Sequence, residues 1–194
     1  KEMENFTGEI TQIPPMYSAI KVNGQKLYDL ARKGIEVERK KRQVNIYSFE
    51  LVEFNFPKAT FKITCSKGTY IRTLIDDLGE SIGSFAFVNS LTRSKVGDFY
   101  LEDAINSEDL ANMSREDVLK RLEPVDYALK AYPKVILDKS YLKQATNGMT
   151  MAVEPMHTES LFRIYVEDEF IGLGKAHKSY DKYFLKMEKV FYEK

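Results

Sequence analysis

The sequence predicts an α+β fold in two parts, a larger mixed region over residues 1–131 and a small β-rich domain over residues 132–194. Alternating and aromatic runs at residues 42–56 and 59–65 are typical of neighbouring strands. Between residues 71 and 82, apolar side chains recur every three or four positions and give one face of a helix. From residue 132 onward, short β-like runs surround one helical piece, SYLKQATNG.

Turn residues divide the first part into short elements. Residues 1–13 are typical of a helix end and a short extended piece, which Pro14-Pro15 closes. Asn23-Gly24 predicts the two-residue turn of a hairpin. Residues 27–33 have the spacing of a short helix, and Gly34 is placed to end it.

The stretch CSKGTYIRTLIDDLGE, residues 65–80, predicts a strand end, a polar turn and a helix. Thr69 is the expected N-cap of this helix, and Gly83 is its expected stop. Residues 85–100 are expected to return as strands, and residues 107–130 to form acidic helices. The strands expected in the C-terminal part are KVILD, LFRIYV, FIGLGKAH and YFLKMEKVFY.

Composition excludes several classes of protein. Hydrophobic residues make up 43% of the 194 residues, enough for a packed core. No apolar run is long enough to span a membrane, and no signal segment opens the chain. The single cysteine, Cys65, excludes an internal disulfide framework and fits a reducing compartment, so a cytoplasmic location is expected. The chain begins at Lys1 inside a periodic stretch, which predicts a piece of a longer protein.

The charges sum to zero but are segregated along the chain. Residues 21–42 carry eight basic side chains against three acidic ones, whereas residues 102–127 carry eight acids against three bases. A local basic field attracts polyanions such as nucleic acid. A solvated strand edge protected against pairing would have the same composition, and both interpretations stay open.

No complete catalytic set is visible from residue types alone. A phosphate loop needs several glycines before Lys-Ser/Thr, and CSKG has one. Ser66, Lys67 and the helix N-terminus would contact at most one phosphate, and an ordinary turn is the simpler interpretation. Cys65 lacks a base, because His157 and His177 both lie in the C-terminal part, and these residues cannot form a zinc set.

Aromatic and basic residues interleave in a way typical of surfaces that bind single-stranded or looped RNA, although core tyrosines are an alternative. Arg93 is expected in mid-strand among apolar neighbours, where burial would require a carboxylate partner. The interleaved residues are Tyr17, Lys21, Lys26, Tyr28, Arg32, Lys33, Tyr70, Arg72 and Arg93.

Three blocks together resemble the TruB family of bacterial tRNA pseudouridine synthases. They are QIPPMYSAIKVNGQKLYDLARKG (12–34), SKGTYIRTLIDDLGESIG (66–83) and LTRSKVGDF (91–99). The resemblance implies an isomerase that converts uridine 55 in the tRNA T-loop to pseudouridine without cofactor or metal. It also implies the C-terminal part of the pseudouridine synthase fold over residues 1–131 and a PUA-like RNA-binding domain over residues 132–194. The partner would be the tRNA T-arm, and the protein a monomer.

The resemblance also assigns roles to residues. The family's catalytic aspartate would lie upstream of Lys1, so the chain alone is expected to be inactive, and Arg93 would be its partner. Where many members have Leu-Arg-Arg, this chain has Leu-Thr-Arg, which leaves a phosphate contact at residue 92 in doubt. The implied active-site pocket residues are Tyr70, Ile71, Gly68, Arg72, Tyr17, Ser18 and Lys21, with Arg72 expected to be buried. The implied RNA-binding residues are Lys26, Arg32, Lys33, Arg39, Lys40, Lys41, Arg42, Lys67 and Lys95.

Two other functions remain open. One is that of a non-catalytic RNA-binding module, which would bind a T-arm hairpin with a steep salt dependence and leave its uridine unchanged. The other is that of an enzyme for a small phosphorylated ligand bound at the CSKG turn. The second function predicts that Lys67→Ala abolishes ligand binding and that RNA does not compete.

Overall fold

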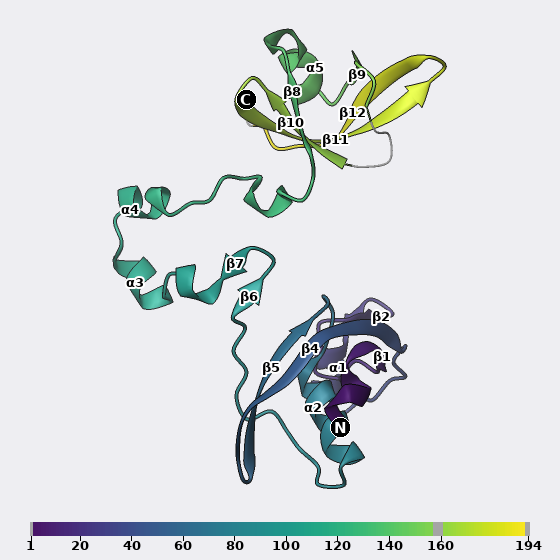
Figure 1. Ribbon diagram of the computed structural model, residues 1–194, viewed down its shortest axis with the longest axis vertical. Coiled ribbons are helices and arrows are strands. Elements are labelled where there is room, and N and C mark those ends of the chain that lie inside the picture. Colours follow the sequence, from purple (N-terminus) through teal and green to yellow (C-terminus); the bar gives the residue numbers. More distant parts are fainter. Residues whose placement is uncertain (1, 157–160, 193–194) are drawn as a thin grey trace. The chain divides into compact units, whose positions relative to one another are not determined.

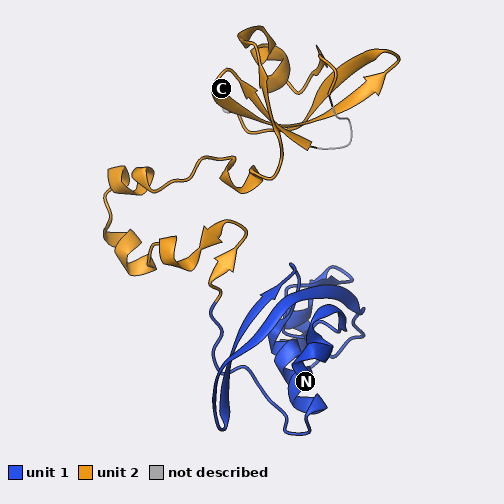
Figure 2. Ribbon diagram, in the orientation of Figure 1, with its two compact units in different colours: residues 1–92 blue, residues 93–194 orange. Residues whose placement is uncertain are grey.

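The computed structural model describes residues 2–156 and 161–192 (Figure 1). The chain forms two compact units, Lys1–Thr92 and Arg93–Lys194, each with its own sheets and its own cluster of buried apolar side chains (Figure 2). The mixed α+β class agrees with the sequence prediction. The predicted domain boundary after Ala131 is a different division and stays a prediction. None of the helices in the described ranges is long and apolar enough to cross a membrane.

The first unit contains a three-stranded antiparallel sheet in the order β1–β4–β5, which comprises β1 (Gly8–Gln12), β4 (Arg42–Asn55) and β5 (Lys58–Cys65). A short 3-10 helix, Glu2–Phe6, precedes it. Val44 and Ile46 face the core, and an irregularity in the β4–β5 register between Ile46 and Ser48 makes Phe49 the next buried residue. Buried positions are therefore even-numbered before this bulge and odd-numbered after it, and the apolar side of β4 faces the core on both sides of the bulge.

Helix α2 (Ile71–Ser81) packs on this sheet through Leu74, Ile75 and Leu78, as its spacing predicts. Gly83, at φ +71°, follows the helix end in the left-handed conformation that favours glycine. Two details of the prediction are wrong. Ile82 is half exposed at the C-cap. The N-cap is Tyr70, because the Thr69 hydroxyl donates to the Ser66 carbonyl instead of capping the helix.

A small hairpin and a helix precede β4. Strands β2 (Lys21–Val22) and β3 (Gln25–Lys26) are joined by Asn23 and Gly24, both at positive φ, which confirms the predicted turn. Helix α1 (Leu27–Arg32) follows at once and buries Leu27 and Leu30. The chain then leaves the helix through Gly34, also at positive φ.

Residues 85–94 do not form the strands that the sequence predicts. The Ser84 and Phe85 amides donate to the Gly79 carbonyl, so this segment begins by closing the end of α2, and within the described chain it pairs with no strand. Phe85 and Phe87 are 75% and 82% exposed. Only the short hairpin of β6 (Lys95–Val96) and β7 (Phe99–Tyr100) forms in the predicted range.

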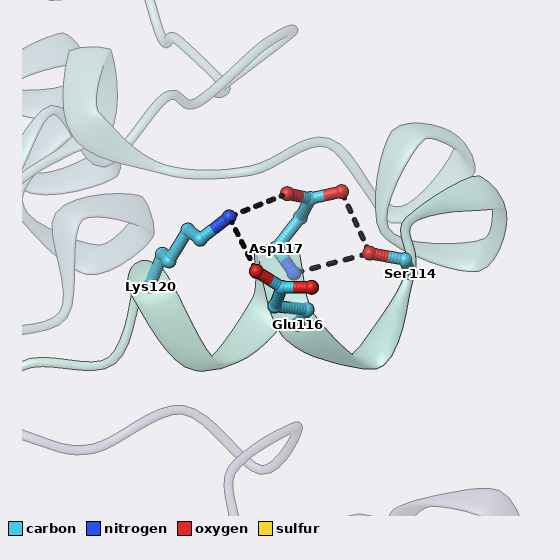
Figure 3. Close-up of polar contacts among 4 residues, drawn as sticks. All are labelled: Ser114, Glu116, Asp117 and Lys120. Carbon is cyan, nitrogen blue, oxygen red and sulfur yellow. Dashed lines mark hydrogen bonds and ion pairs between the residues drawn. The ribbon is translucent and has the colours of Figure 1, made fainter.

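The acidic segment of residues 107–130 is less helical than predicted. It contains two short helices, α3 (Ser107–Asn112) and α4 (Arg115–Lys120), and a 3-10 turn at Tyr127–Leu129. Another 3-10 turn, Leu101–Asp103, precedes it. The Ser114 hydroxyl accepts from the Asp117 amide and donates to its carboxylate at 2.7 Å (Figure 3). Lys120 pairs with Glu116 and Asp117 one turn earlier. These local contacts stabilise α4 although none of its residues is buried.

The second unit ends in a five-stranded sheet in the order β8–β10–β11–β12–β9, and all five strands lie within residues 132–194. Its pairs are antiparallel except β8–β10. Strand β9 was not among the predicted strands. A 3-10 turn (Lys139–Tyr141) and α5 (Leu142–Thr146) add Ala145 to the core around Ile164, Ile171 and Leu185. The strands are β8 (Lys134–Leu137), β9 (Thr150–Val153), β10 (Leu161–Val166), β11 (Glu169–Ser179) and β12 (Lys182–Val190).

Asp126 ties the segment before β8 to strand β10. Its carboxylate is buried and accepts hydrogen bonds from the Arg163 guanidinium at 2.7 Å and from the Tyr165 hydroxyl. Arg163 also donates to the Tyr132 carbonyl. Burial acts to raise the pKa of Asp126, but the bonds from Tyr165 and Arg163 outweigh it and hold this pKa below its ordinary value.

Candidate functional site

Gln12 joins the first two sequence blocks. It is 1% exposed at the end of β1, its amide nitrogen donates to the Tyr70 carbonyl at 3.3 Å, and its amide oxygen accepts from the Tyr70 amide at 3.0 Å. Both polar groups of one buried side chain are thus satisfied by one residue 58 positions away. Gln12 therefore fixes the backbone that carries Tyr70, a role that the sequence interpretation missed.

Arg72 makes a second link between the same two blocks. Its guanidinium donates to the Tyr17 carbonyl at 3.2 Å, across 55 positions. This is a polar contact of the kind expected, and the role of Arg72 in bracing the site stays a prediction. The prediction that Arg72 is buried is wrong. As the second residue of α2, Arg72 projects from the first turn, where only the apolar side packs on the sheet, so its charged end stays in solvent.

Two hydrogen bonds hold the CSKG turn against β4. The backbone amide of Asn45 donates to the Ser66 hydroxyl at 2.9 Å, and the backbone amide of Ser66 donates to the backbone carbonyl of Asn45 at 2.8 Å. Gly68 has φ +84°, a conformation that other residues rarely adopt. Because Ser66 and Thr69 are engaged within the turn, Lys67 is the exposed basic side chain that this stretch offers to a ligand.

The predicted pocket residues differ in exposure. Tyr17 is 59% exposed, whereas Ser18 is 5% exposed and its hydroxyl has no partner among the described residues. Tyr70 and Ile71 are half-buried. Lys21 lies in β2 directly opposite Lys26. The structure therefore joins Arg72 to Tyr17 and Tyr70 to Gln12 by hydrogen bonds, and leaves Lys21 on the neighbouring hairpin.

Two of the predicted RNA-binding residues contact Tyr28. The Lys26 ammonium donates to the Tyr28 hydroxyl at 3.0 Å, and this bond raises the pKa of Lys26. The Arg32 guanidinium lies 5.4 Å from the centre of the same ring. Both cations stay exposed and bring the positive charge to one side of the hairpin and α1.

Arg39 differs from its basic neighbours. Its side chain is 23% exposed, donates to the Pro14 carbonyl at 3.3 Å and pairs with Glu36 at 3.0 Å. It therefore anchors the segment before β4 to the Pro14 turn, which leaves less of its charge available to a ligand than predicted. Lys40 and Lys41 are exposed and, with Arg39, line a hollow of about 610 Å³, together with Ile13, Glu36, Val37 and Glu38.

Arg93 does not occupy the buried mid-strand position expected from the sequence. It is exposed in an extended segment, because residues 85–94 form no strand, and no hydrogen bond or ion pair involves it in the described part of the chain. Two residues later, Lys95 starts β6 and lies 4.5 Å from the centre of the Tyr100 ring. The link between Arg93 and a carboxylate stays a prediction.

Cys65 ends β5, half-buried against the core of the first unit, and is a free thiol. His177 lies on β11, and His157 lies outside the described residues. Within residues 2–156 and 161–192, no group of His, Cys, Asp and Glu is arranged to hold a metal ion.

Comparison with known proteins identifies the family. The TruB family pseudouridylate synthase N-terminal domain matches residues 1–71, and the tRNA pseudouridylate synthase B C-terminal domain matches residues 72–130. The chain belongs to the TruB family. The TruB chain is 45% identical over 179 residues to the tRNA pseudouridine synthase B of Clostridium kluyveri and 43% identical over 180 residues to that of Clostridium tetani.

These matches cover 90% and 91% of the chain but 61% of each relative, so the chain spans about three fifths of their length. Among solved structures, a Cbf5-Nop10-Gar1 complex is similar with a TM-score of 0.72 and 28% identity, over 98% of this chain and 60% of that one. The fold is therefore that of the pseudouridine synthases, as predicted.

Proposed function

We propose that this TruB chain forms the tRNA-binding wall of a tRNA pseudouridine synthase that converts uridine 55 in the T-loop. The observation that carries the proposal is the double link of Gln12 to Tyr70 and of Arg72 to Tyr17. It joins the two longest family blocks around one exposed aromatic ring, one guanidinium and the exposed Lys67. Rings beside cations are the groups that hold an unstacked base and its phosphates.

The chemistry is an isomerisation that needs no net redox change. An aspartate attacks the flipped uridine, and the bond between N1 of the base and C1′ of the ribose breaks. The base turns and forms a bond from its C5 to C1′, the aspartate is released, C5 loses its proton and N1 gains one, so the product is an isomer of the substrate. We place that aspartate outside residues 1–194, because the sequence contains no Gly-x-x-Asp-type block. The chain would contribute the pocket residues Tyr70, Ile71, Gly68 and Tyr17, and act as a monomer in the cytoplasm.

The predicted partner of the aspartate is Arg93, and Arg72 is the matched comparison because its guanidinium lies within the linked cluster. We expect Arg93→Lys in the full-length protein to cut turnover at least about a hundredfold, with little change in tRNA affinity, because a guanidinium orients a carboxylate in a way that an ammonium cannot. Tritium release from carbon 5 of labelled uridine measures turnover. Normal turnover in Arg93→Lys together with a loss in Arg72→Lys would transfer the role to Arg72.

The same tritium-release measurement on the 194-residue chain tests whether the catalytic aspartate lies outside these residues. We expect salt-sensitive binding of a T-arm hairpin and no tritium release. Release by the chain alone would show that an acid within these residues is the nucleophile. Binding without release by the full-length protein as well would favour the non-catalytic RNA-binding module.

A further inference from the structure

We propose that Asp126 and Tyr127 are positioning residues, which form a joint that holds the β6–β7 hairpin on the C-terminal five-stranded sheet. Through this joint, the sheet sets the place of Arg93, which lies two residues before the hairpin. The inference rests on the proposed function, because it takes the block at residues 91–99 as part of the active centre. All three family blocks end before residue 100, so neither residue of the joint belongs to them.

Asp126 forms the side of the joint that faces the sheet. Its buried carboxylate accepts hydrogen bonds from the Arg163 guanidinium at 2.7 Å and from the Tyr165 hydroxyl. The backbone amide of Arg163 also donates to the Pro133 carbonyl at 2.8 Å, and its guanidinium donates to the Tyr132 carbonyl at 2.9 Å. One residue of β10 therefore holds this segment at both ends, and the segment cannot shift along the sheet without breaking the ion pair.

Tyr127 forms the side of the joint that faces the hairpin. Its ring packs against Phe99 of β7, with centroids 5.2 Å apart and planes at 53°, and its hydroxyl donates to the Asp98 carbonyl at 3.4 Å. Aromatic pairs at this separation attract each other beyond the area that they bury. In the described part of the chain, this ring pair and this hydrogen bond are the ones that join the hairpin to the C-terminal sheet and the turns before it.

The backbone between the two side chains is short and fixed by turns. Asp126 and Tyr127 are adjacent, the Tyr127 amide donates to the Pro124 carbonyl at 2.9 Å, and the Leu129 amide donates to the Asp126 carbonyl at 2.8 Å. By contrast, none of residues 101–125, which connect the hairpin to the joint along the chain, is buried. The place of the hairpin relative to the sheet therefore depends on Tyr127 rather than on the connecting segment.

The hairpin carries this position to Arg93. The Leu101 amide donates to the Ser94 carbonyl at 2.9 Å, next to the pair of Lys95 and Tyr100, so the ladder reaches the residue that follows Arg93. A guanidinium that orients a carboxylate needs the right direction as well as the right distance. A displacement of about 1 Å in such a group can lower turnover about a hundredfold.

The first test compares two substitutions of Tyr127 in the full-length protein, with turnover measured by tritium release. Tyr127→Leu removes the ring pair and the hydroxyl, and we expect kcat to fall at least about tenfold while KM for tRNA changes less than about twofold. Tyr127→Phe keeps the ring pair and loses only a long hydrogen bond, so it should retain at least about half of kcat. A residue that only stabilises the fold would not separate kcat from KM in this way.

Phe99→Leu breaks the same ring pair from the other side. Its effect on kcat should not add to that of Tyr127→Leu, and the double variant should stay within about twofold of Tyr127→Leu alone, because both substitutions remove one contact. Additive losses of kcat would overturn the proposal.

The second test measures the joint without RNA. Spin labels at Val96→Cys on the hairpin and Lys186→Cys on β12, in a Cys65→Ser background of the 194-residue chain, report the distance between hairpin and sheet by double electron–electron resonance. We expect one narrow distance distribution in this labelled parent chain and with Tyr127→Phe. Tyr127→Leu and Asp126→Asn should each broaden it, because each frees one side of the joint.

Tyr141→Leu is the matched control. Tyr141 is another half-buried tyrosine of the same unit, and its hydroxyl donates to the Ala152 carbonyl at 3.2 Å, away from the hairpin. The control should leave kcat and the distance distribution unchanged. An equal fall of kcat in the control would overturn the proposal in favour of general destabilisation.

Two further outcomes separate this inference from the proposed function. A broad distribution in the labelled parent chain, or a raised KM with normal kcat in Tyr127→Leu, would overturn the joint or its positioning role and leave the proposed function standing. If the wild-type full-length protein forms no pseudouridine, the proposed function is overturned and the positioning role with it.

Discussion

At the scale of single residues, the buried amide of Gln12 is the contact on which the candidate site most depends. We expect Gln12→Leu to lower the free energy of unfolding by about 2 kcal/mol, because the Tyr70 amide loses the acceptor that satisfies it. Urea denaturation of the 194-residue chain measures the loss.

Gln43→Ala is the matched control for Gln12→Leu, since Gln43 is exposed and its side chain accepts only from the Thr11 hydroxyl. Its effect should stay within about 0.5 kcal/mol. An equally small effect of Gln12→Leu would mean that the Tyr70 backbone is held in place by other contacts.

Asp126 predicts a pH dependence of stability. Because its folded pKa lies below the ordinary value of 3.8, its contribution is present above pH 4 and is lost as pH falls through the folded pKa. At pH 7, Asp126→Asn should cost about 3 kcal/mol, since the partly buried Arg163 loses its counter-charge. Parallel urea denaturation at pH 7 and at the lowest pH where the chain folds should show this cost shrinking.

The exposed Asp168→Asn change serves as the control for Asp126→Asn and should alter stability little at either pH. If Asp126→Asn lowers the free energy of unfolding equally at both pH values, then packing and not the carboxylate charge stabilises this contact.

At the scale of elements, α2 depends on a glycine that the sequence pattern did not single out. A Cβ on Gly79 would lie 2.3 Å from the Ala86 amide nitrogen, a backbone atom. We expect Gly79→Ala to destabilise the first unit by about 1–3 kcal/mol despite alanine's better helix propensity. Hydrogen exchange of α2 amides measures this effect, and Glu80→Ala, at an exposed neighbouring position, should leave the exchange nearly unchanged.

The elements that local patterns define were predictable, and those that need a distant partner were not. Asn23-Gly24 specifies its own turn, and the spacing of Leu74, Ile75 and Leu78 specifies one helix face. Residues 85–94 have a strand composition, but a strand requires a ladder partner, and within the described chain this segment has none; its first amide, that of Phe85, donates to the Gly79 carbonyl. Likewise, the family blocks pointed to Tyr70 and Arg72, whereas no local signal predicts that Gln12 and Tyr17 would hold them.

At the scale of the whole molecule, equal numbers of acidic and basic side chains give a net charge of zero. Long-range attraction of RNA by net charge is therefore absent, and binding must depend on local basic surfaces. Within the basic run at residues 39–42, the structure separates two roles. Arg39 holds the backbone at Pro14, and Lys40 and Lys41 present their charge to solvent beside the neighbouring hollow.

This separation predicts two different outcomes from one stretch. Lys40→Gln with Lys41→Gln should flatten the salt dependence of T-arm RNA binding by about 1.4–1.8 and leave the urea midpoint unchanged. Arg39→Gln should lower the urea midpoint, since it breaks the contacts with Pro14 and Glu36. The control is Lys58→Gln with Lys62→Gln, which removes equal charge from exposed positions of β5. If that control flattens the slope equally, total charge governs binding and the basic run is a protected strand edge.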